Sequence, residues 1–288
     1  MKVVVIGGNG QLGHDVTRAF AEEGHAVTSL THQDVEVSSL ESVRESLNEL
    51  KPEMVVNTSA FHHVEKCEAE PALAFAINAI GARNLAQVTK DAGATLLHIS
   101  TDYVFDGAAH APYPEDARTG PLNVYGKSKL KGERHVQALC RRHVIVRSSG
   151  LYGVAGSAGK GGNFVRTMLR IGADKGEVSV VTDQTLAPTS TNDLAKVIWR
   201  LIDRDAQGLF HVTNSGACSW FEFAQAIFEL RDMSVEVHPI DSITLGYRAR
   251  RPAYSVLDNA RLDHDGYGVM RPWREALARH LEALGPLT

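Results

Sequence analysis

The sequence predicts an α/β fold with a doubly wound parallel sheet, on the basis of two observations. Short, continuous apolar runs alternate with amphipathic segments through the first half of the chain. Strands of this kind are buried on both faces, as in a parallel sheet covered by helices. In addition, the first apolar run leads directly into glycines at positions 7, 10 and 13. This spacing between a strand and a helix is typical of the first turn of a Rossmann sheet.

Each strand of the first half is expected from a short apolar run, and each helix from apolar residues that recur every three or four positions. The expected strands are residues 3–6, 26–30, 54–56, 95–99 and 144–146. The expected helices are residues 11–23, 40–50 and 71–92, and a further helix that holds Tyr125. Ligands should bind beyond the carboxyl ends of these strands.

The pattern becomes less regular near residue 150. A glycine-rich stretch over residues 150–162 predicts a mobile loop. Later helices are expected at residues 163–171, 192–203 and 220–230, and later strands at residues 178–181 and 208–212. We predict a dinucleotide-binding domain of residues 1–153 plus about 192–214. The remaining residues, about 154–191 and 215–288, are expected to form a smaller, discontinuous α/β substrate-binding lobe.

Composition excludes several classes of function. A formal charge of −4 and a pI near 6.3 give no electrostatic basis for nucleic-acid binding. No apolar run is long enough to span a membrane, and no signal peptide precedes the first strand. The 3 cysteines and 13 histidines lack the spacing of a disulfide framework or a metal site. The sequence therefore predicts a cytoplasmic protein without a bound metal.

The glycine turn predicts a dinucleotide site. Gly7 allows the tight turn, Gly10 lets the backbone approach a pyrophosphate, and Gly13 permits close packing of helix on sheet. Gln11 and Leu12 begin the helix, whose positive end faces the phosphates. The alternative is a glycine turn that holds no ligand.

The second strand bears on the choice of cofactor. It ends at Leu30, Thr31 and His32, without the acid that binds the free ribose hydroxyls of NAD. Asp34 and Glu36 come slightly later, and no arginine stands there to bind a 2′-phosphate. We hypothesise that the protein uses NADPH and tolerates NADH.

Thr101, Tyr125 and Lys129 form a candidate catalytic set. Tyr125 and Lys129 lie one helical turn apart on one face, and Thr101 ends a strand. Such a tyrosine can protonate a carbonyl oxygen, and a neighbouring ammonium and a nicotinamide cation should lower its pKa. Thr101 would polarise that oxygen, and Lys129 would also hold the nicotinamide ribose. A Tyr-x-x-x-Lys pair alone is equally typical of a surface helix.

These residues resemble the extended short-chain dehydrogenase/reductase superfamily. Residues 100–107 (Ser-Thr-Asp-Tyr-Val-Phe-Asp-Gly) and 121–126 (Pro-Leu-Asn-Val-Tyr-Gly) resemble the dTDP-4-dehydrorhamnose reductases. The likeness continues at residues 55–57, 64–68, 162–164, 183–189 and 251–252. The resemblance implies reduction of the 4-keto group of dTDP-4-dehydro-L-rhamnose, or of a close nucleotide-sugar analogue, by NAD(P)H. It also makes a homodimer plausible.

The resemblance extends to individual side chains. It implies that Ala60 and Asn78 lie along the cofactor cleft. It also implies that five residues face the nucleotide sugar: His62, Tyr103, Asn163, Gln184 and Arg251.

The chain departs from the family pattern at two positions of the sugar pocket. It has His62 where a threonine is usual, and Gly150 where a tryptophan usually packs on the deoxysugar. The predicted chemistry is therefore better supported than the identity of the sugar. His62 and the adjacent His63 are equally consistent with histidines satisfied by local backbone.

Other residues fit ordinary structural roles. Arg248 and Arg250 are expected on a solvated surface. An aromatic group on one helix, Trp220, Phe221 and Phe223, has the spacing of core residues. Asp102 and Asp106 are expected to shape their loop or to contact substrate.

Two other functions remain open. The chain is also compatible with a non-catalytic NADP-binding regulatory subunit, because a fold does not fix a function. The third reading is a nucleotide-sugar epimerase or dehydratase, which would retain its nicotinamide tightly through turnover.

Overall fold

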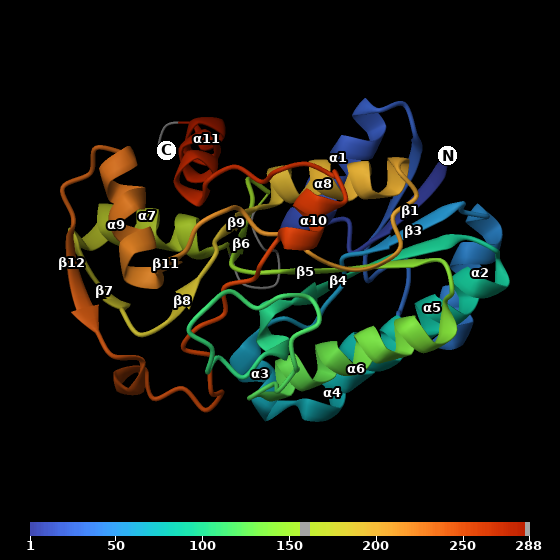
Figure 1. Cartoon of the computed structure of the whole chain (residues 1–288), viewed down its shortest axis with the longest axis horizontal. Coiled ribbons are helices and arrows are strands. Elements are labelled where there is room, and N and C mark those ends of the chain that lie inside the picture. Colours follow the sequence, from blue (N-terminus) through green and yellow to red (C-terminus); the bar gives the residue numbers. More distant parts are fainter. Residues whose placement is uncertain (156–161, 286–288) are drawn as a thin grey trace.

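A computed structural model describes residues 1–155 and 162–285 of the chain. Its centre is a six-stranded parallel sheet in the order β10-β5-β4-β3-β1-β2 (Figure 1). The strands are β1 (Lys2–Ile6), β2 (Ala26–Leu30), β3 (Met54–Asn57), β4 (Thr95–Thr101), β5 (His143–Ser148) and β10 (Gly208–His211). The predicted doubly wound α/β fold is confirmed.

Helices cover both faces of this sheet (Figure 1). One face packs on α1 (Gln11–Glu22) and α8 (Thr191–Asp203), with the short α10 (Ala260–His264) beside β10. The other face packs on α2 (Leu40–Leu50), α5 (Ala82–Asp91) and α6 (Val124–Leu139). Because alternate residues of β1 point to opposite faces, Val3 and Val5 enter the first core and Val4 and Ile6 the second.

The segment predicted as one helix over residues 71–92 is divided into three. It runs through α4 (Pro71–Phe75), the π-helical turn η1 (Ala76–Gly81) and α5. The preceding α3 (Val64–Ala69) follows β3. Apolar spacing does not distinguish a normal helical turn from a π turn, which inserts a residue and often occurs near functional sites.

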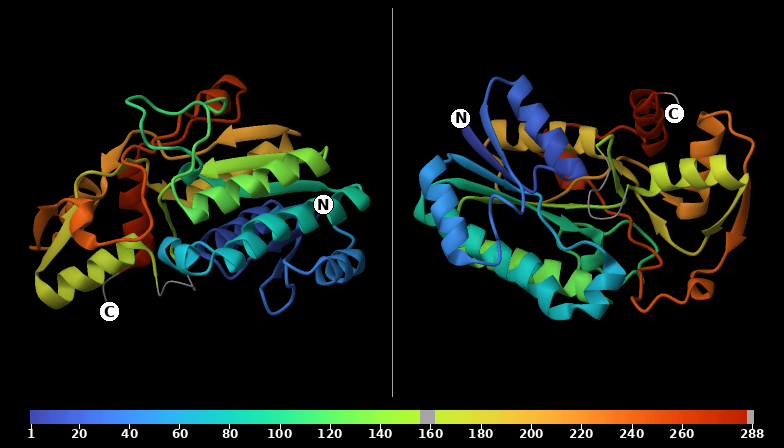
Figure 2. Two further views of the ribbon diagram at one scale, coloured as in Figure 1. Left: turned by 90° about the horizontal axis from the view of Figure 1, so that it is seen from below. Right: turned by 180° about the vertical axis from the view of Figure 1, so that it is seen from behind.

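The later segments build a second core beside the sheet (Figures 1 and 2). It packs α7 (Phe164–Lys175), α9 (Trp220–Leu230) and α11 (Trp273–Leu284) around short strand pairs. These pairs are β7 (Glu177–Val181) with β12 (Glu236–Ile240), β8 (Thr185–Leu186) with β11 (Cys218–Ser219), and β6 (Leu151–Tyr152) with β9 (Thr189–Ser190). The expected return of residues 192–214 is present, because α8 and β10 join the main sheet. The exact domain boundaries remain a prediction.

The glycine-rich stretch is partly described. Residues 150–155 include β6, which contradicts an uninterrupted loop at its start. Residues 156–161 of that prediction lie outside the described residues. Gly150 adopts a φ of 55°, and a Cβ there would lie 2.7 Å from Leu186 Cδ1. Its replacement by a larger residue would therefore require a strained backbone and a shift of the Leu186 side chain.

Candidate active site

A cleft of about 900 Å³ opens at the carboxyl ends of the strands. The glycine turn, the ends of β3 and β4, the start of α6 and the second core all line it. Among the residues predicted from the sequence, the lining includes Gly7, Gly10, Gln11, Leu12, Gly13, Ala60, His62, Thr101, Tyr103, Tyr125, Lys129, Asn163, Gln184 and Arg251. Asn78 is not among them. The structure thus brings together the predicted cofactor, catalytic and substrate residues in one cavity.

The glycine turn has the shape that a pyrophosphate requires. Gly7 adopts a φ of 80°, and a Cβ on Gly13 would lie 2.3 Å from Gly7 O. No side chain caps the N-terminus of α1, whose first turn begins at Gln11. The uncapped backbone N–H groups and the helix dipole therefore favour an anion at this turn. These residues fit the diphosphate of a dinucleotide.

The end of β2 lines another part of the cleft where the cofactor is predicted to bind. Thr31, His32 and Glu36 line the cleft there. The Asp34 carboxylate accepts hydrogen bonds from Thr31 N and Thr31 Oγ1, both at 2.8 Å, which lower the pKa of Asp34. Asp34 is thus held by its own turn. Among the residues that line the described cleft, neither Lys nor Arg comes from this segment.

Tyr125 and Thr101 meet where α6 faces the end of β4. A hydrogen bond with Thr101 favours the phenolate of Tyr125, but burial is the larger effect and raises the pKa of Tyr125. The sequence argument that neighbouring cations lower this pKa is therefore corrected for the free protein. A raised pKa keeps the phenol protonated at neutral pH, which suits a group that donates a proton.

Asp102 is a site residue whose role the sequence left open. Its buried carboxylate accepts hydrogen bonds from Thr101 Oγ1 and Ser149 Oγ, each at 2.9 Å. Burial raises the pKa of Asp102 above its ordinary value. Tyr103 N in turn donates to Thr101 Oγ1 at 3.2 Å. Asp102 therefore orients the Thr101 hydroxyl.

A buried ion pair fixes β4 and β5 to the catalytic helix. Arg147 on β5 donates from Nε and Nη2 to Glu133 on α6, at 2.9 and 2.7 Å. Ser100 Oγ, next to Thr101, donates to the same carboxylate. A bidentate pair of this kind constrains direction as well as distance. It holds Thr101 at a fixed position relative to α6.

The start of α6 is fixed by two side chains. Asn123 Oδ1 accepts from Gly126 N at 2.8 Å, and Glu68 Oε1 of α3 accepts from Val124 N at 2.7 Å. Asn123 Nδ2 also donates to Arg250 O at 2.8 Å. These contacts satisfy N–H groups of the first turn and connect the Tyr125 helix to the segment that carries Arg251.

Two predicted site residues have structural partners. Asn78 is buried behind the cleft, where Oδ1 accepts from Phe61 N and Nδ2 donates to Phe61 O and to Ser128 Oγ. It positions the wall that Ala60 and His62 form, and its contact with a cofactor remains a prediction. Asn163 Nδ2 donates to Gly153 O and to Gln11 Oε1 while Oδ1 caps α7 at Arg166 N. Both of its donor hydrogens are thus used within the protein.

The remaining predicted substrate residues stand at the opening toward the second core. The Tyr103 ring packs edge-on against Tyr125, with centroids 5.8 Å apart, and burial raises the pKa of Tyr103 to about 12. Arg251 lies over the ring of Tyr247 and 3.9 Å from Glu65 Oε1. His62 Nδ1 lies 3.2 Å from Ala60 O. Gln184 is buried, and its carbonyl accepts from Trp220 N.

The aromatic group on α9 has two roles. Phe223 is buried in the second core, as predicted. Trp220 was expected only to pack, but it also lines the cleft with Phe164, and their ring centroids are 4.5 Å apart. Helical spacing could not reveal this role, because it shows which face of α9 is apolar but not that Trp220 reaches the cleft. The two rings offer an apolar surface in the cleft that Gly150 also lines.

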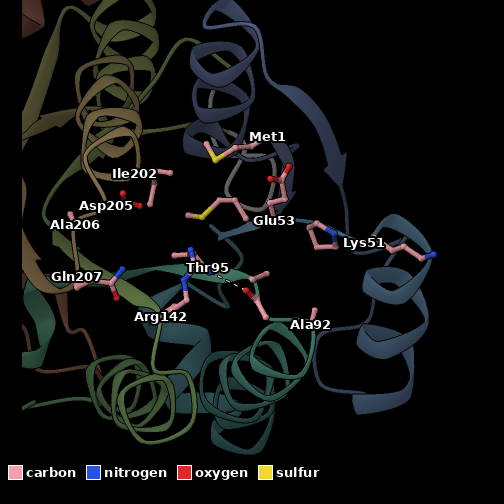
Figure 3. A pocket seen from close by; sticks show the side chains of 14 residues that line it. Met1, Lys51, Glu53, Ala92, Thr95, Arg142, Ile202, Asp205, Ala206 and Gln207 are labelled. Carbon is pink, nitrogen blue, oxygen red and sulfur yellow. Dashed lines mark hydrogen bonds between the residues drawn. The ribbon is translucent and has the colours of Figure 1, made fainter.

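A smaller hollow of about 370 Å³ lies at the opposite, amino ends of the strands (Figure 3). Met1, Glu53 and Thr95 line it, and Arg142 donates to Gly93 O at 3.2 Å beside it. It contains none of the predicted site residues. In the described part of the chain, no group of three or more histidine, cysteine or acidic residues is placed to hold a metal. No described helix is long and apolar enough to cross a membrane.

Comparison with known proteins gives one family. The chain is 41% identical to the spore coat polysaccharide biosynthesis protein SpsK of Bacillus subtilis, over 98% of this chain and 97% of that protein. A crystal structure of a dTDP-4-dehydrorhamnose reductase from Clostridium acetobutylicum has a TM-score of 0.95 at 40% identity, covering 99% of this chain and 100% of that one.

A dTDP-4-dehydrorhamnose reductase from Bacillus anthracis, solved in complex with NADP, has a TM-score of 0.93 at 38% identity, covering 98% of this chain and 99% of that one. A family model described as the RmlD substrate binding domain matches residues 1–285. The resemblance drawn from the sequence motifs is confirmed, and the chain belongs to the RmlD substrate binding domain family.

Proposed function

We propose that this protein is an NAD(P)H-dependent reductase of the 4-keto group of a nucleotide-linked 4-keto-6-deoxy sugar. dTDP-4-dehydro-L-rhamnose is the leading substrate, with dTDP-L-rhamnose as product. The observation that carries the proposal is that Thr101, Tyr125 and Lys129 line the same cavity as the uncapped glycine turn. The reductase named in the Bacillus anthracis complex with NADP supports the cofactor class.

Thr101, Tyr125 and Lys129 each have a separate role in the proposed reaction. When bound, NADPH would supply a hydride to the keto carbon. Thr101, which donates to Asp102 in the free protein, would turn its hydroxyl hydrogen to the keto oxygen, and Tyr125 would donate its phenolic proton to that oxygen. The raised pKa of Tyr125 keeps this proton in place until the oxygen becomes basic. Lys129 holds the nicotinamide ribose beside Tyr125.

The residues proposed to bind the substrate line the same cavity. Tyr103 and Gln184 are proposed to contact the sugar, and Arg251 the diphosphate, because a guanidinium suits phosphate oxygens. Trp220 and Phe164 provide the apolar surface that Gly150 does not. This altered surface makes the choice of sugar a separate question from the reaction. A homodimer and a cytoplasmic location are part of the proposal, the latter because the described cysteines, Cys67, Cys140 and Cys218, form no disulfide.

The deciding experiment is reduced-nicotinamide oxidation with a panel of dTDP-4-keto-6-deoxy sugars, for wild type beside Tyr125→Phe. Wild type should oxidise NADPH, and Tyr125→Phe should be about 10²–10⁴-fold slower, because it lacks the donor hydroxyl. NADPH affinity of the variant should be unchanged. Product stereochemistry then identifies the sugar.

Two results would contradict the proposal. NADPH binding without turnover on any sugar of the panel would favour a regulatory subunit. Purified protein that retains tightly bound nicotinamide and converts a nucleotide sugar without net oxidation would favour an epimerase or dehydratase.

A further inference from the structure

A buried pair of polar side chains lies directly behind Lys129. Asn57 ends β3 and His98 stands opposite it on β4, in the register of the parallel pair. Both are almost fully buried, with exposed fractions of 2% and 1%. Asn57 Nδ2 lies 3.0 Å from His98 Nδ1, and His98 Nε2 lies 3.5 Å from Lys129 Nζ. The three side chains form a line that ends at the catalytic lysine.

The orientation of the Asn57 amide follows from its other partners. Asn57 Oδ1 accepts from Ser59 N at 3.0 Å and from Ser59 Oγ at 2.6 Å. A backbone N–H can only donate, so the atom that faces it must be the amide oxygen. The amide nitrogen therefore faces His98. This nitrogen also can only donate.

The tautomer of His98 follows in turn. Because Asn57 Nδ2 donates to it, His98 Nδ1 must be the unprotonated, accepting nitrogen. Burial, and secondarily the charge of Lys129, lower the pKa of His98 well below its ordinary value, so the ring is neutral. A neutral ring with an unprotonated Nδ1 carries its hydrogen on Nε2. That hydrogen points toward Lys129.

We propose that Asn57 and His98 are positioning residues for the reaction proposed above: they present an N–H, rather than a lone pair, to Lys129 Nζ, and so favour the uncharged amine. An ammonium group has three donor hydrogens and no lone pair, so it cannot accept from Nε2–H. Lys129 instead donates to Ile99 O at 2.5 Å. A neutral amine satisfies both neighbours at once, because it donates to Ile99 O and accepts from His98.

The other charges around α6 do not reverse this effect. Glu133, one turn beyond Lys129, favours the ammonium but is already paired with Arg147. Glu68 is bound to Val124 N, and Asp102 to Thr101 and Ser149. Burial has a larger effect than Glu133 and lowers the pKa of Lys129 to about 8. Other titratable groups on α6 and on the elements packed against it are Cys67, Tyr103, Tyr125, Glu65, Lys66, Arg83, Lys90, Asp91, Lys127, Lys131, Arg134, His135 and His143. Among the described residues, Glu133 is the group whose charge shifts the pKa of Lys129.

The consequence for the reaction is a lysine that releases a proton readily. After Tyr125 has given its proton to the substrate oxygen, its phenolate needs another. An ammonium form that is opposed by His98 releases a proton at a lower energetic cost than an ordinary lysine would.

The first test requires neither a variant nor turnover. In protein labelled with ¹⁵N-histidine, the two ring nitrogens of His98 should show the shifts of an unprotonated Nδ1 and a protonated Nε2 between pH 6 and 9. The signal is assigned by its loss in His98→Phe. An Nδ1–H tautomer, or a charged ring in this range, would overturn the proposal.

The second test measures the titration of Lys129 directly, from its ¹³Cε shift in the cofactor-free protein, assigned with Lys129→Arg. Asn57→Asp should reverse the tautomer of His98. A carboxylate accepts a hydrogen bond from Nδ1–H, which leaves Nε2 unprotonated and able to accept from the Lys129 ammonium. The Lys129 midpoint should then rise by about one pH unit or more.

A matched background separates this effect from the added negative charge. The same Asn57→Asp change in a His98→Phe protein should raise the midpoint much less. An equal rise in both backgrounds would mean that charge alone acts, and the proposal would be wrong. Because these readouts need no substrate, they stand apart from any failure of the proposed reductase activity, which the nicotinamide assay would reveal separately.

Discussion

At the scale of single residues, the site depends on groups whose hydrogen-bonding directions are fixed. Thr101 accepts from Tyr103 N and donates to Asp102, so its hydroxyl has a defined orientation before substrate arrives. Asp102 in turn accepts from Ser149. In the proposed reaction, Thr101 must therefore turn its hydrogen from Asp102 to the keto oxygen. The partners of Thr101 are the next two residues of the chain, but Ser149, which binds Asp102, follows β5 and could not be read from local spacing.

Gly13→Ala tests the glycine turn at this scale. A Cβ there would lie 2.3 Å from Gly7 O and 2.7 Å from Gly8 Cα, so backbone must move. We expect a destabilisation of about 1–3 kcal/mol in urea unfolding, together with loss of NADPH binding.

Gly10→Ala is the matched control. Its Cβ would meet only Gly7 O, at 3.2 Å, and its φ of −78° suits any residue. This variant should keep most of its stability while NADPH affinity falls, because the methyl group occupies the approach to the pyrophosphate. Equal unfolding free energies for Gly13→Ala and wild type would contradict the role assigned to Gly13.

At the scale of elements, the catalytic helix α6 is fixed at its N-terminus from outside. The Glu68 carboxylate of α3 accepts from Val124 N at 2.7 Å. Glu68→Ala leaves that N–H without its partner, and should cost about 1–3 kcal/mol of unfolding free energy. Glu68→Gln retains an acceptor and should lose only the charge at the helix end, about 0.3–1 kcal/mol. Urea unfolding of the three proteins measures both values, and a Gln variant as unstable as the Ala variant would contradict this assignment.

The secondary-structure elements were predicted well where a single sequence pattern determines them. The strands of the main sheet appear at the expected places, because a buried parallel strand needs a continuous apolar run. The helix over residues 71–92 was predicted as continuous and is interrupted by η1. There α6 approaches so closely that a Cβ on Gly132 would lie 2.4 Å from Asn78 O. This tertiary contact leaves no mark in the apolar pattern of either segment.

At the scale of the whole molecule, most of the site could be predicted because the fold gathers strand ends. Gly7, Thr101 and Tyr125 lie far apart in sequence, yet each follows or faces the carboxyl end of a strand in one sheet. Trp220 and Phe164 lie outside that rule. They reach the cleft through the packing of the second core, which short strand pairs and irregular segments build. Their role could be found only from the three-dimensional structure.

The pH dependence of folding is also a property of the whole molecule. Burial, with a smaller effect of nearby arginines, lowers the pKa of His211 to about 3 and of His280 to about 4, and the pKa of His98 is lowered as well. Below pH 6.5, the ordinary pKa of histidine, these histidines bind protons in the unfolded chain but not in the folded one. Stability should therefore be full above about pH 7 and fall as pH decreases, by up to about 1.4 kcal/mol per pH unit for each histidine.

Asp102, whose pKa is raised, acts in the opposite sense and reduces this slope. Urea unfolding at pH 7.5 and 5.5 measures the effect. His280→Gln should flatten the dependence. Stability that is equal at the two pH values in wild type would contradict the prediction.

The contacts that hold the two edges of the cleft differ in strength. On one edge, Gln11 receives hydrogen bonds from Gly153 N and Asn163 Nδ2 and donates to Leu151 O, so the start of α1 and the start of α7 are joined through largely buried amides. On the other edge, Glu65 accepts from Arg248 N and stands 3.9 Å from Arg251. That second connection is partly exposed and electrostatic, and water can replace it at little cost. The side of the cleft that Glu65 and Arg251 join therefore separates at a lower free-energy cost than the side that Gln11 joins.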